Sequence, residues 1–149
     1  MINLKTEKQQ VGYCGPASLK IVLDYYGIHY SQEQIAKKTN ASHTKGCAEK
    51  DMAKFAKKLG LKAYIKQNSS IKELKILLKQ GIPVIVDWFS PEQAGHYCVV
   101  AGIKGNNIFL SDPHFGKIVK HKISWFEERW FDMPFANKPL IREIIVIRR

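Results

Sequence analysis

The sequence predicts an α+β domain in which a helical first half is followed by a strand-rich second half. Up to about residue 81, apolar residues recur at helical spacing between capping and glycine signals. From Pro83 onward, short runs of β-branched and aromatic residues alternate with turn residues. No linker rich in Gly, Ser or Pro separates the two halves, so we expect residues 1–149 to form a single domain.

Four helices are expected in the first half, over residues 14–26, 32–38, 47–59 or 48–59, and 71–80. The first helix carries Pro16 in its opening turn, where the missing N–H group is tolerated, and it stops at Gly27. Capping boxes that begin at Ser31 and at Ser70 predict the starts of the second and fourth helices. The loop over residues 40–46 precedes the third helix.

Six strands are expected, over residues 62–66, 84–89, 96–103, 108–112, 117–122 and 140–148. Each run is rich in residues that favour strands and is bounded by turn residues. Residues 104–107 have the composition of a hairpin turn, so the strands on either side of this turn are expected to pair antiparallel. Ser124 and Glu127 predict a capping box for a short aromatic helix before the last strand.

Composition narrows the function class. The longest apolar stretch, residues 82–86, is far shorter than the ~20 residues of a membrane-spanning helix, and no signal peptide precedes it. Three widely spaced cysteines fit neither a disulfide framework nor a CxxC zinc site, which favours a reducing, cytoplasmic compartment. The net charge of +11 is spread over helix faces without a nucleic-acid motif, so nucleic acid is not the expected main partner.

Cys14 stands at the start of the first expected helix, within the segment VGYCGPAS. The positive end of the helix dipole and the unpaired N–H groups of the first turn favour thiolate over thiol, and thiolate is the nucleophilic form. The alternative is a buried structural cysteine, because a free Cys packs as a small hydrophobe. Cys14 is therefore a candidate nucleophile whose role depends on the residues that lie beside it.

The expected hairpin supplies a partner for this thiol. His96 opens one strand and Asp112 closes the next, so antiparallel pairing sets the two positions nearly level. A carboxylate beside an imidazole fixes the tautomer of the ring and stabilises its charged form. With Cys14 at the same sheet edge, nucleophile, base and orienting carboxylate would share one cleft. Each residue also has a structural alternative, since a strand-end His is commonly a surface group and Asp-Pro commonly ends a strand.

Several motifs occur together, namely YCGPASL, YYG, GC before the third helix, GHYCVV and SDP. As a set they resemble the papain-like bacteriocin-processing double-glycine peptidases, over roughly residues 7–132. The resemblance implies a papain-like fold with Cys14 as nucleophile, His96 as general base and acid, and Asp112 as the residue that orients His96. It also implies cleavage of leader peptides after Gly-Gly, by cytosolic domains that are often fused to peptide-exporting ATP-binding transporters.

The chain departs from that family at the oxyanion hole. The family has a glutamine six residues before the nucleophile, and this place is Lys8 here. We assign the side-chain donor to Gln9, with Gln10 as the fallback, and the second donor to the backbone N–H of Cys14. The sequence shows no membrane span and no phosphate-binding P-loop, so the chain is expected to be a stand-alone peptidase or an excised domain.

The sequence therefore predicts a single peptidase domain that cleaves peptides after small residues, without a cofactor or a metal ion, with an ABC exporter as a candidate partner. One alternative is a catalytically silent domain that holds a leader peptide in the same groove. Another is a peptidyl transferase with the same thiol chemistry, resembling phytochelatin synthase. A metal site made of Cys14, His96, Cys98 and His114 lacks ligand pairs at zinc-finger spacing. Cys47 is expected to have a structural role.

Overall fold

The computed structural model describes residues 1–135 and 137–149. The helices are α1 (Cys14–Tyr25), α2 (Gln32–Lys38), α3 (Glu49–Lys58), α4 (Ile71–Lys79) and α5 (Ile123–Glu128). The strands are β1 (Lys62–Lys66), β2 (Val84–Ser90), β3 (Ala94–Lys104), β4 (Asn107–Asp112), β5 (Lys117–Lys122), β6 (Phe131–Phe135), β7 (Lys138–Ile141) and β8 (Glu143–Arg148). One antiparallel sheet has the order β1-β8-β2-β3-β4-β5, and β6 pairs with β7. The expected α+β class is confirmed.

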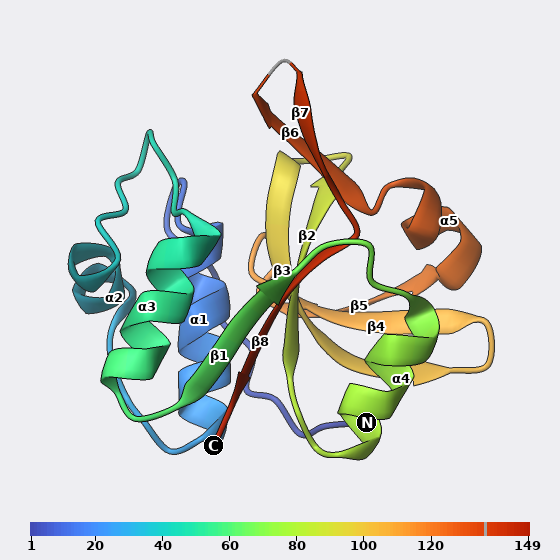
Figure 1. Ribbon diagram of the computed structural model, residues 1–149, viewed down its shortest axis with the longest axis horizontal. Coiled ribbons are helices and arrows are strands. Elements are labelled where there is room, and N and C mark those ends of the chain that lie inside the picture. The colour runs from blue at the N-terminus through green and yellow to red at the C-terminus, as the bar shows by residue number, and fades with distance from the viewer. Residues whose placement is uncertain (136) are drawn as a thin grey trace.

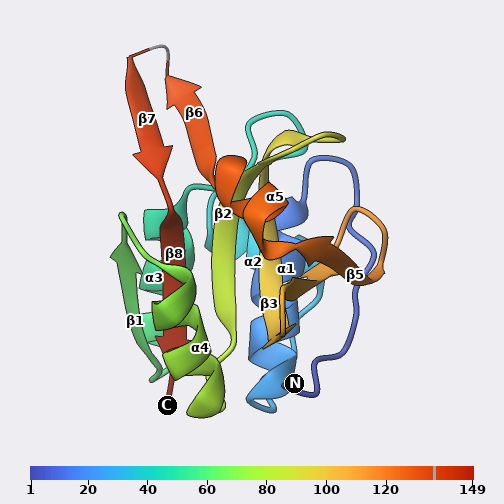
Figure 2. The same cartoon turned by 90° about the vertical axis from the view of Figure 1, so that its right-hand side faces the viewer.

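The sheet separates two apolar cores (Figure 1). Helices α1, α2 and α3 pack on one face, against residues such as Ile85 and Val99. Helices α4 and α5 cover the other face, where Val86 and Trp88 are buried; Figure 2 shows these two helices in front of the sheet. Neighbouring residues of β2 and β3 serve different cores because side chains alternate along a strand. None of the helices in the described residues has the length and apolar composition needed to span a bilayer.

Helix α1 begins at Cys14, as the sequence predicts, and packs along β3 (Figure 1). The hydroxyl of Ser18 donates to the backbone carbonyl of Tyr97 at 3.2 Å, which fixes the first turns of the helix to the strand that carries His96. The helix ends before Gly27, whose φ of 78° lies in the left-handed region that glycine adopts most readily. The start of α1 is thus held beside β3 by both packing and hydrogen bonding.

Two expected helix starts are wrong. Helix α3 begins at Glu49, so Cys47 precedes the helix instead of opening it. Helix α5 begins at Ile123 and has Lys122 as its N-cap, which leaves Ser124 inside the helix, where it cannot cap the first turn. In both cases the expected start differs from the observed one by one or two residues, which is the usual uncertainty of a helix end.

The two other capping boxes differ in completeness. Ser31 and Gln34 form both reciprocal bonds, so this box is confirmed. At α4, Ser70 accepts the backbone N–H of Glu73 at 3.1 Å, but the carboxylate of Glu73 accepts from Lys66 at 2.8 Å. The ion pair with β1 replaces the second half of the expected box, because a charged partner attracts the carboxylate more strongly than a backbone N–H does.

The expected last strand over residues 140–148 is in fact two strands. Arg142 separates β7 from β8 and has a φ of 47°, in the left-handed region, which interrupts the extended chain. The sequence also gave no indication of β6, which contains Pro134 and lacks a plain strand pattern. In Figure 1 the β6–β7 hairpin projects from one end of the sheet, above β2.

Strand β3 contains a β-bulge. Ala101 is an extra residue between Val100 and Gly102, whose partners on β4 are consecutive residues. A bulge shifts by one residue the pairing of all positions beyond it. A glycine within a strand pattern is a known signal for a bulge, so Gly102 was the indication that the sequence offered.

The bulge decides which face of the sheet carries Asp112. Val99 pairs with Ser111, and the register continued by one residue sets Asp112 opposite Cys98, on the face shared with His96. Pairing without a bulge would set Asp112 opposite Val99, on the other face. The expectation that His96 and Asp112 are level is wrong by two residues, and His96 is the third residue of β3. Their side chains can still meet, because diagonal neighbours on one face are within reach.

Candidate active site

His96 and Asp112 form a buried pair at one end of the β3–β4 hairpin. Nε2 of His96 lies 2.7 Å from Oδ1 of Asp112, and each side chain is 1% exposed. The same carboxylate oxygen accepts the backbone N–H of His114 at 2.9 Å. This second hydrogen bond holds the carboxylate in place, so that it fixes the orientation of the imidazole ring.

The thiol of Cys14 also acts on this imidazole. Nδ1 of His96 is buried and has no hydrogen-bond partner of ordinary geometry among the described residues. The half-buried thiol of Cys14, at the first position of α1, is close enough to act on the ring as a side-chain hydrogen-bond partner. Contacts of this kind are commonly long in an empty active site and tighten with substrate. The ring therefore has Asp112 on one nitrogen, and its other nitrogen is open to a further partner.

The pKa values of this pair shift in opposite directions. Burial works against the charged imidazolium, yet the pKa of His96 is raised because Cys98, Asp112 and Cys14 favour the proton. Burial also works against the carboxylate, yet the pKa of Asp112 is lowered, chiefly by the hydrogen bond and charge of His96. Together the two shifts describe one buried ion pair of imidazolium and carboxylate.

Cys98 adjoins this pair as a neutral thiol. It is fully buried and accepts the indole N–H of Trp88 at 3.2 Å. Burial raises the pKa of Cys98 to about 11, so its charge can act on His96 only in alkaline solution. The ligand atoms of His96, Cys98 and Asp112 lie within 4.8 Å of one another. Among the described residues this grouping takes in Asp112 and leaves out Cys14 and His114, unlike the metal set considered from the sequence.

Gln9 and Lys8 both donate hydrogen bonds to the chain just after β4, next to the site. The backbone N–H of Gln9 donates to the carbonyl of Pro113 at 2.9 Å, just beyond the end of β4. The side-chain oxygen of Gln9 is buried and has no hydrogen-bond partner in the part of the chain that the structure describes. Gln10 is exposed, and the ammonium of Lys8 donates to the carbonyl of His114. The local backbone thus favours Gln9 over Gln10 as the polar side chain nearest to the site.

The first turn of α1 leaves backbone donors free. Its N-cap, Tyr13, makes no side-chain capping bond, and the N–H groups of a first turn have no acceptor within the helix. The N–H of Cys14 is one of these groups. Unpaired N–H groups at a helix start attract negative charge, including the oxyanion that forms when a thiolate attacks a carbonyl.

Cys47 packs against the start of this helix. A Cβ on Gly15 would lie 2.6 Å from the Cβ of Cys47, so only glycine permits this close approach. The hydroxyl of Tyr97 donates to the carbonyl of Cys47 at 3.1 Å. Burial raises the pKa of the Cys47 thiol to about 11, which leaves it protonated at neutral pH. These contacts support the structural role expected from the sequence.

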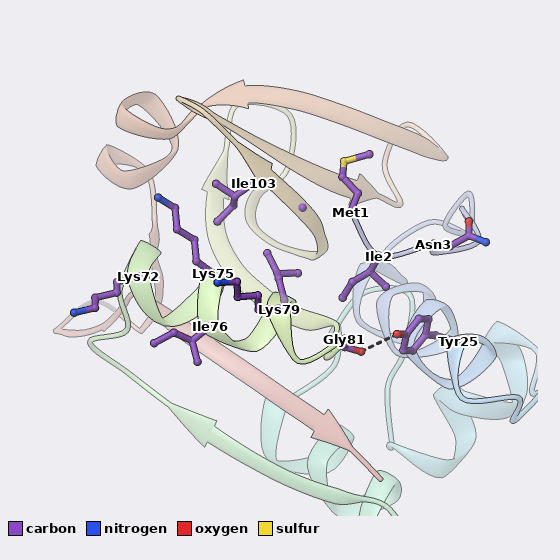
Figure 3. A pocket seen from close by; sticks show the side chains of 12 residues that line it. Met1, Ile2, Asn3, Tyr25, Lys72, Lys75, Ile76, Lys79, Gly81 and Ile103 are labelled. Carbon is purple, nitrogen blue, oxygen red and sulfur yellow. Dashed lines mark hydrogen bonds between the residues drawn. The ribbon is translucent and has the colours of Figure 1, made fainter.

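Cys14 opens into a cleft of about 750 Å³. Side chains of several elements line it, among them Cys47, Glu49, Asp87, Tyr97 and Asp132. A second cavity, of about 770 Å³, lies at the far end of α1, between the first residues of the chain and α4. Figure 3 shows its lysine-rich wall and the hydrogen bond from the Tyr25 hydroxyl to the carbonyl of Gly81, which is 2.7 Å long. The cavity in Figure 3 is lined by neither cysteine nor histidine, so the chemistry belongs to the cleft at Cys14.

Three carboxyl groups near this cleft were not identified from the sequence. Burial, followed by the nearby Asp132, raises the pKa of Asp87 to about 10. Burial, followed by Glu49 and Asp132, raises the pKa of Glu143 to about 8. In the sequence, Asp87 interrupts the apolar run of β2, and a charged residue inside a buried strand is a signal that was available. The contact of Asp132 with this group depends on the β6–β7 hairpin, which the sequence pattern did not reveal.

Known relatives match most of this chain. The Lactococcin-G-processing and transport ATP-binding protein LagD of Lactococcus lactis subsp. lactis is 29% identical over 128 residues, which are 85% of this chain and 17% of LagD. The transport/processing ATP-binding protein ComA of Streptococcus pneumoniae (strain ATCC BAA-255 / R6) is 30% identical over 131 residues, or 85% of this chain and 17% of ComA. The chain therefore spans about a sixth of the length of these relatives.

Solved structures share the fold. The peptidase domain of Streptococcus ComA matches with a TM-score of 0.78 and 22% identity, covering 99% of this chain and 98% of that one. A double glycine motif protease from an AMS/PCAT transporter, solved in complex with its leader peptide, matches with a TM-score of 0.77 and 23% identity, covering 99% and 92%. The expected papain-like peptidase fold is confirmed. The family described as Peptidase_C39 like family matches residues 1–136, and the chain belongs to this family of cysteine peptidase domains.

Proposed function

We propose that this chain is a cysteine peptidase that cleaves a peptide bond after small residues of the Gly-Gly type. The observation that carries the proposal is the arrangement around His96. One ring nitrogen is held 2.7 Å from the Asp112 carboxylate, and the other has no ordinary partner among the described residues. Cys14 is among the side chains that raise the pKa of His96. A thiol, a base and an orienting carboxylate are the parts that acyl transfer requires.

In the first half of the reaction, Cys14 starts as the thiolate and His96 as the imidazolium that Asp112 stabilises. The thiolate attacks the carbonyl carbon after the small residue, and a tetrahedral intermediate with a C–S bond forms. Protonated His96 gives its proton to the leaving nitrogen, the C–N bond breaks, and the amine product departs. Asp112 stabilises the imidazolium throughout and keeps the ring in place. Cys14 is left as a thioester.

In the second half, His96 is neutral and takes a proton from a water molecule, which attacks the thioester carbonyl. The new tetrahedral intermediate collapses with cleavage of the C–S bond, and the thiolate of Cys14 is restored beside an imidazolium. The acid product then leaves. One water molecule is consumed, and His96 transfers one proton in each half. The sum of the two halves is hydrolysis.

The oxyanion of each intermediate needs hydrogen-bond donors. We assign these to the backbone N–H of Cys14, at the uncapped start of α1, and to the side-chain amide of Gln9. The hydrogen bond from the Gln9 backbone to Pro113 places this residue beside the end of β4, which supports the choice. Gln10 remains the fallback, although its exposure makes it the weaker candidate.

We further infer that residues 1–149 act as one peptidase domain in the cytoplasm and that the substrate is a peptide destined for export. The relatives support this, because their names couple processing to transport. A leader peptide bound to a protease of the same fold is consistent with a peptide in the cleft of this chain. An ABC exporter is accordingly the proposed partner.

Cleavage of a synthetic peptide with a central Gly-Gly, followed by product masses, tests the proposal. We expect hydrolysis after the second glycine by the natural chain and none by Cys14→Ala. Glu128→Gln, at an exposed position on α5, is the matched control and should cleave normally. Binding without cleavage would contradict the peptidase and favour the silent domain. Products in which the acyl part is joined to an added amine, with no free acid, would favour the transferase.

A further inference from the structure

The inner wall of the cleft at Cys14 gathers carboxyl groups, although the chain as a whole carries a net charge of +11. Glu49, Asp87 and Asp132 line it, and Glu143 is the partner of Asp87 in the register between β2 and β8. Lysines 45 and 50 lie at the exposed outer part of the lining. Acidic side chains are thus gathered where the proposed substrate would lie.

Asp87 is the most deeply buried member of this group. It is 3% exposed, and neither carboxylate oxygen has a hydrogen-bond donor within the described ranges. Its position in β2 sets it opposite Tyr97, on the sheet face that also carries α1. A buried carboxyl group without a donor is strongly unfavourable and needs a partner to compensate its desolvation. The side chain lines the cleft, so a ligand in the cleft can supply that partner.

The neighbours of Asp87 make its charged form still less favourable. Asp132 reaches it from β6 because Gly95 has no side chain: a Cβ on Gly95 would lie 2.4 Å from Oδ1 of Asp132. Glu143 from β8 and Glu49 from α3 add like charge. The one proton of the Tyr97 hydroxyl, from β3, is shared between the carbonyl of Cys47 and the carboxylate of Glu49, each 3.1 Å away, and so is already engaged. The empty cleft therefore keeps a proton on this group, and a cation would replace it.

The spacing of the group favours an extended organic cation over a metal ion. Among the described residues, only His96, Cys98 and Asp112 bring three ligand atoms within 4.8 Å of one another. The carboxyl groups of the cleft do not meet that condition, so they cannot all ligate one small ion. An ammonium or guanidinium on a flexible stem can enter the cleft and donate to more than one carboxylate.

We propose that this acidic pocket binds the cationic side chain of a lysine or arginine in the peptide substrate, close to the bond that Cys14 attacks. The inference rests on the proposed function and names a second feature of its substrate besides the small residues. The entering ammonium forms hydrogen bonds to Asp87 and Asp132, and the proton shared by these two groups leaves to water. Charge-assisted hydrogen bonds in a dry pocket make such a contact selective.

A positional set of Gly-Gly peptides tests this. Each peptide carries one lysine at one of the four positions before Gly-Gly or the three positions after it, and each is matched by a peptide with norleucine, which has a similar shape without the charge. We expect one position at which lysine raises kcat/KM about tenfold or more over norleucine. The ratio should persist in Glu128→Gln and fall below about threefold in Asp87→Asn.

Two further measurements keep the outcome decisive. Asp132→Asn, at a half-exposed position, should lower the same ratio even if Asp87→Asn folds poorly. The lysine preference should also rise from pH 6 to pH 8.5, because the pocket loses a proton when the ammonium binds. The titrating groups that face Asp87 are Asp132, Glu143, Glu49 and Tyr97.

A binding arm separates failure of this inference from failure of the peptidase. Fluorescence anisotropy with Cys14→Ala measures affinity for the labelled lysine and norleucine peptides without turnover. Cleavage without any lysine preference, or equal binding of both peptides at every position, would overturn the acidic pocket as a cation site. Preferential binding without cleavage by the natural chain would support the pocket and contradict the peptidase.

Discussion

Two buried groups of ionisable side chains lie on opposite faces of the β2–β3 pair, and they balance their charges in different ways. On one face, His96 and Asp112 carry opposite charges and share a hydrogen bond of 2.7 Å. On the other, Asp87 and its carboxyl neighbours carry like charges, and Asp87 has no donor among the described residues. The first group is stable as an ion pair without a ligand, whereas the second must keep a proton or acquire a cation.

The comparison separates two uses of burial. Burial opposes the charge of every group involved. The pKa of Asp112 is nevertheless lowered, whereas the pKa of Asp87 is raised to about 10. The difference comes from the nearest neighbour, which is an imidazole in one case and another carboxyl group in the other. The His96–Asp112 pair already has its charges in place for a reaction. The carboxyl groups around Asp87 lack an opposite charge, so they favour the binding of a cation.

Removal of the nucleophile should have the largest effect. Cys14→Ala leaves the His96–Asp112 pair intact but without a thiol, and the rate of Gly-Gly cleavage should fall by ~10⁴-fold or more. Product formation measured by mass spectrometry checks this. Cleavage that persists at a tenth of the natural rate would show that the site at Cys14, His96 and Asp112 is not the catalytic one.

Loss of the orienting carboxylate comes next. Asp112→Ala removes the hydrogen bond that positions His96, and kcat should fall by ~10³-fold. Asp112→Asn keeps an acceptor for the ring and should lose less. A pH–rate profile distinguishes positioning from simple destabilisation, because the acid limb should move when the Asp112 charge is lost. Equal activity of the two variants would indicate that the hydrogen bond has no role.

The oxyanion donor should matter less again. Gln9→Ala should lower kcat by ~10²–10³-fold, with KM little changed, since the amide bonds to the oxyanion of the intermediate. Gln10→Ala is the matched control, one residue away and exposed. If Gln10→Ala shows the larger loss, the fallback assignment is the right one.

The smallest expected effect is on the thermal stability of the protein, and it comes from Asp87. The pKa of Asp87 is raised from 3.8 to about 10 by burial first and then by Asp132, Glu143 and Glu49. The contribution of Asp87 to stability is therefore full below the pKa that Asp87 has in the unfolded chain, 3.8, and this contribution is lost as the pH rises towards about 10. Asp87→Asn should raise the melting temperature by a few degrees at pH 8 and by less at pH 5. Thermal unfolding followed by circular dichroism checks this, and destabilisation that grows with pH would be the contrary result.

Local signals in the sequence were sufficient for much of the fold. Strands β1 and β5 have the expected bounds, because turn residues flank each β-rich run. The start of α1 at Cys14 also follows from residues within one turn. The division of the last strand at Arg142 does not, because a left-handed arginine is imposed by the surrounding structure and carries no residue-type signal.

The two faces of β2–β3 were not equally predictable. The pairing of His96 with Asp112 was expected because a hairpin brings the two residues together, although the bulge at Ala101 that brings Asp112 to the face of His96 was missed. The acidic pocket depends on β6, which reaches β3 through the close approach of Asp132 to Gly95. A contact between segments so far apart in the chain has no local pattern, so the structure was needed to reveal it.

The rate of thiol alkylation at each cysteine, measured by peptide mapping in the natural chain and in His96→Ala, tests most directly whether Cys14 and His96 act as a pair. Burial keeps Cys47 and Cys98 protonated at neutral pH. We predict that Cys14 reacts fastest and that His96→Ala slows this reaction at least tenfold. Equal labelling of all three thiols, or a Cys14 rate that His96→Ala leaves unchanged, would contradict the account.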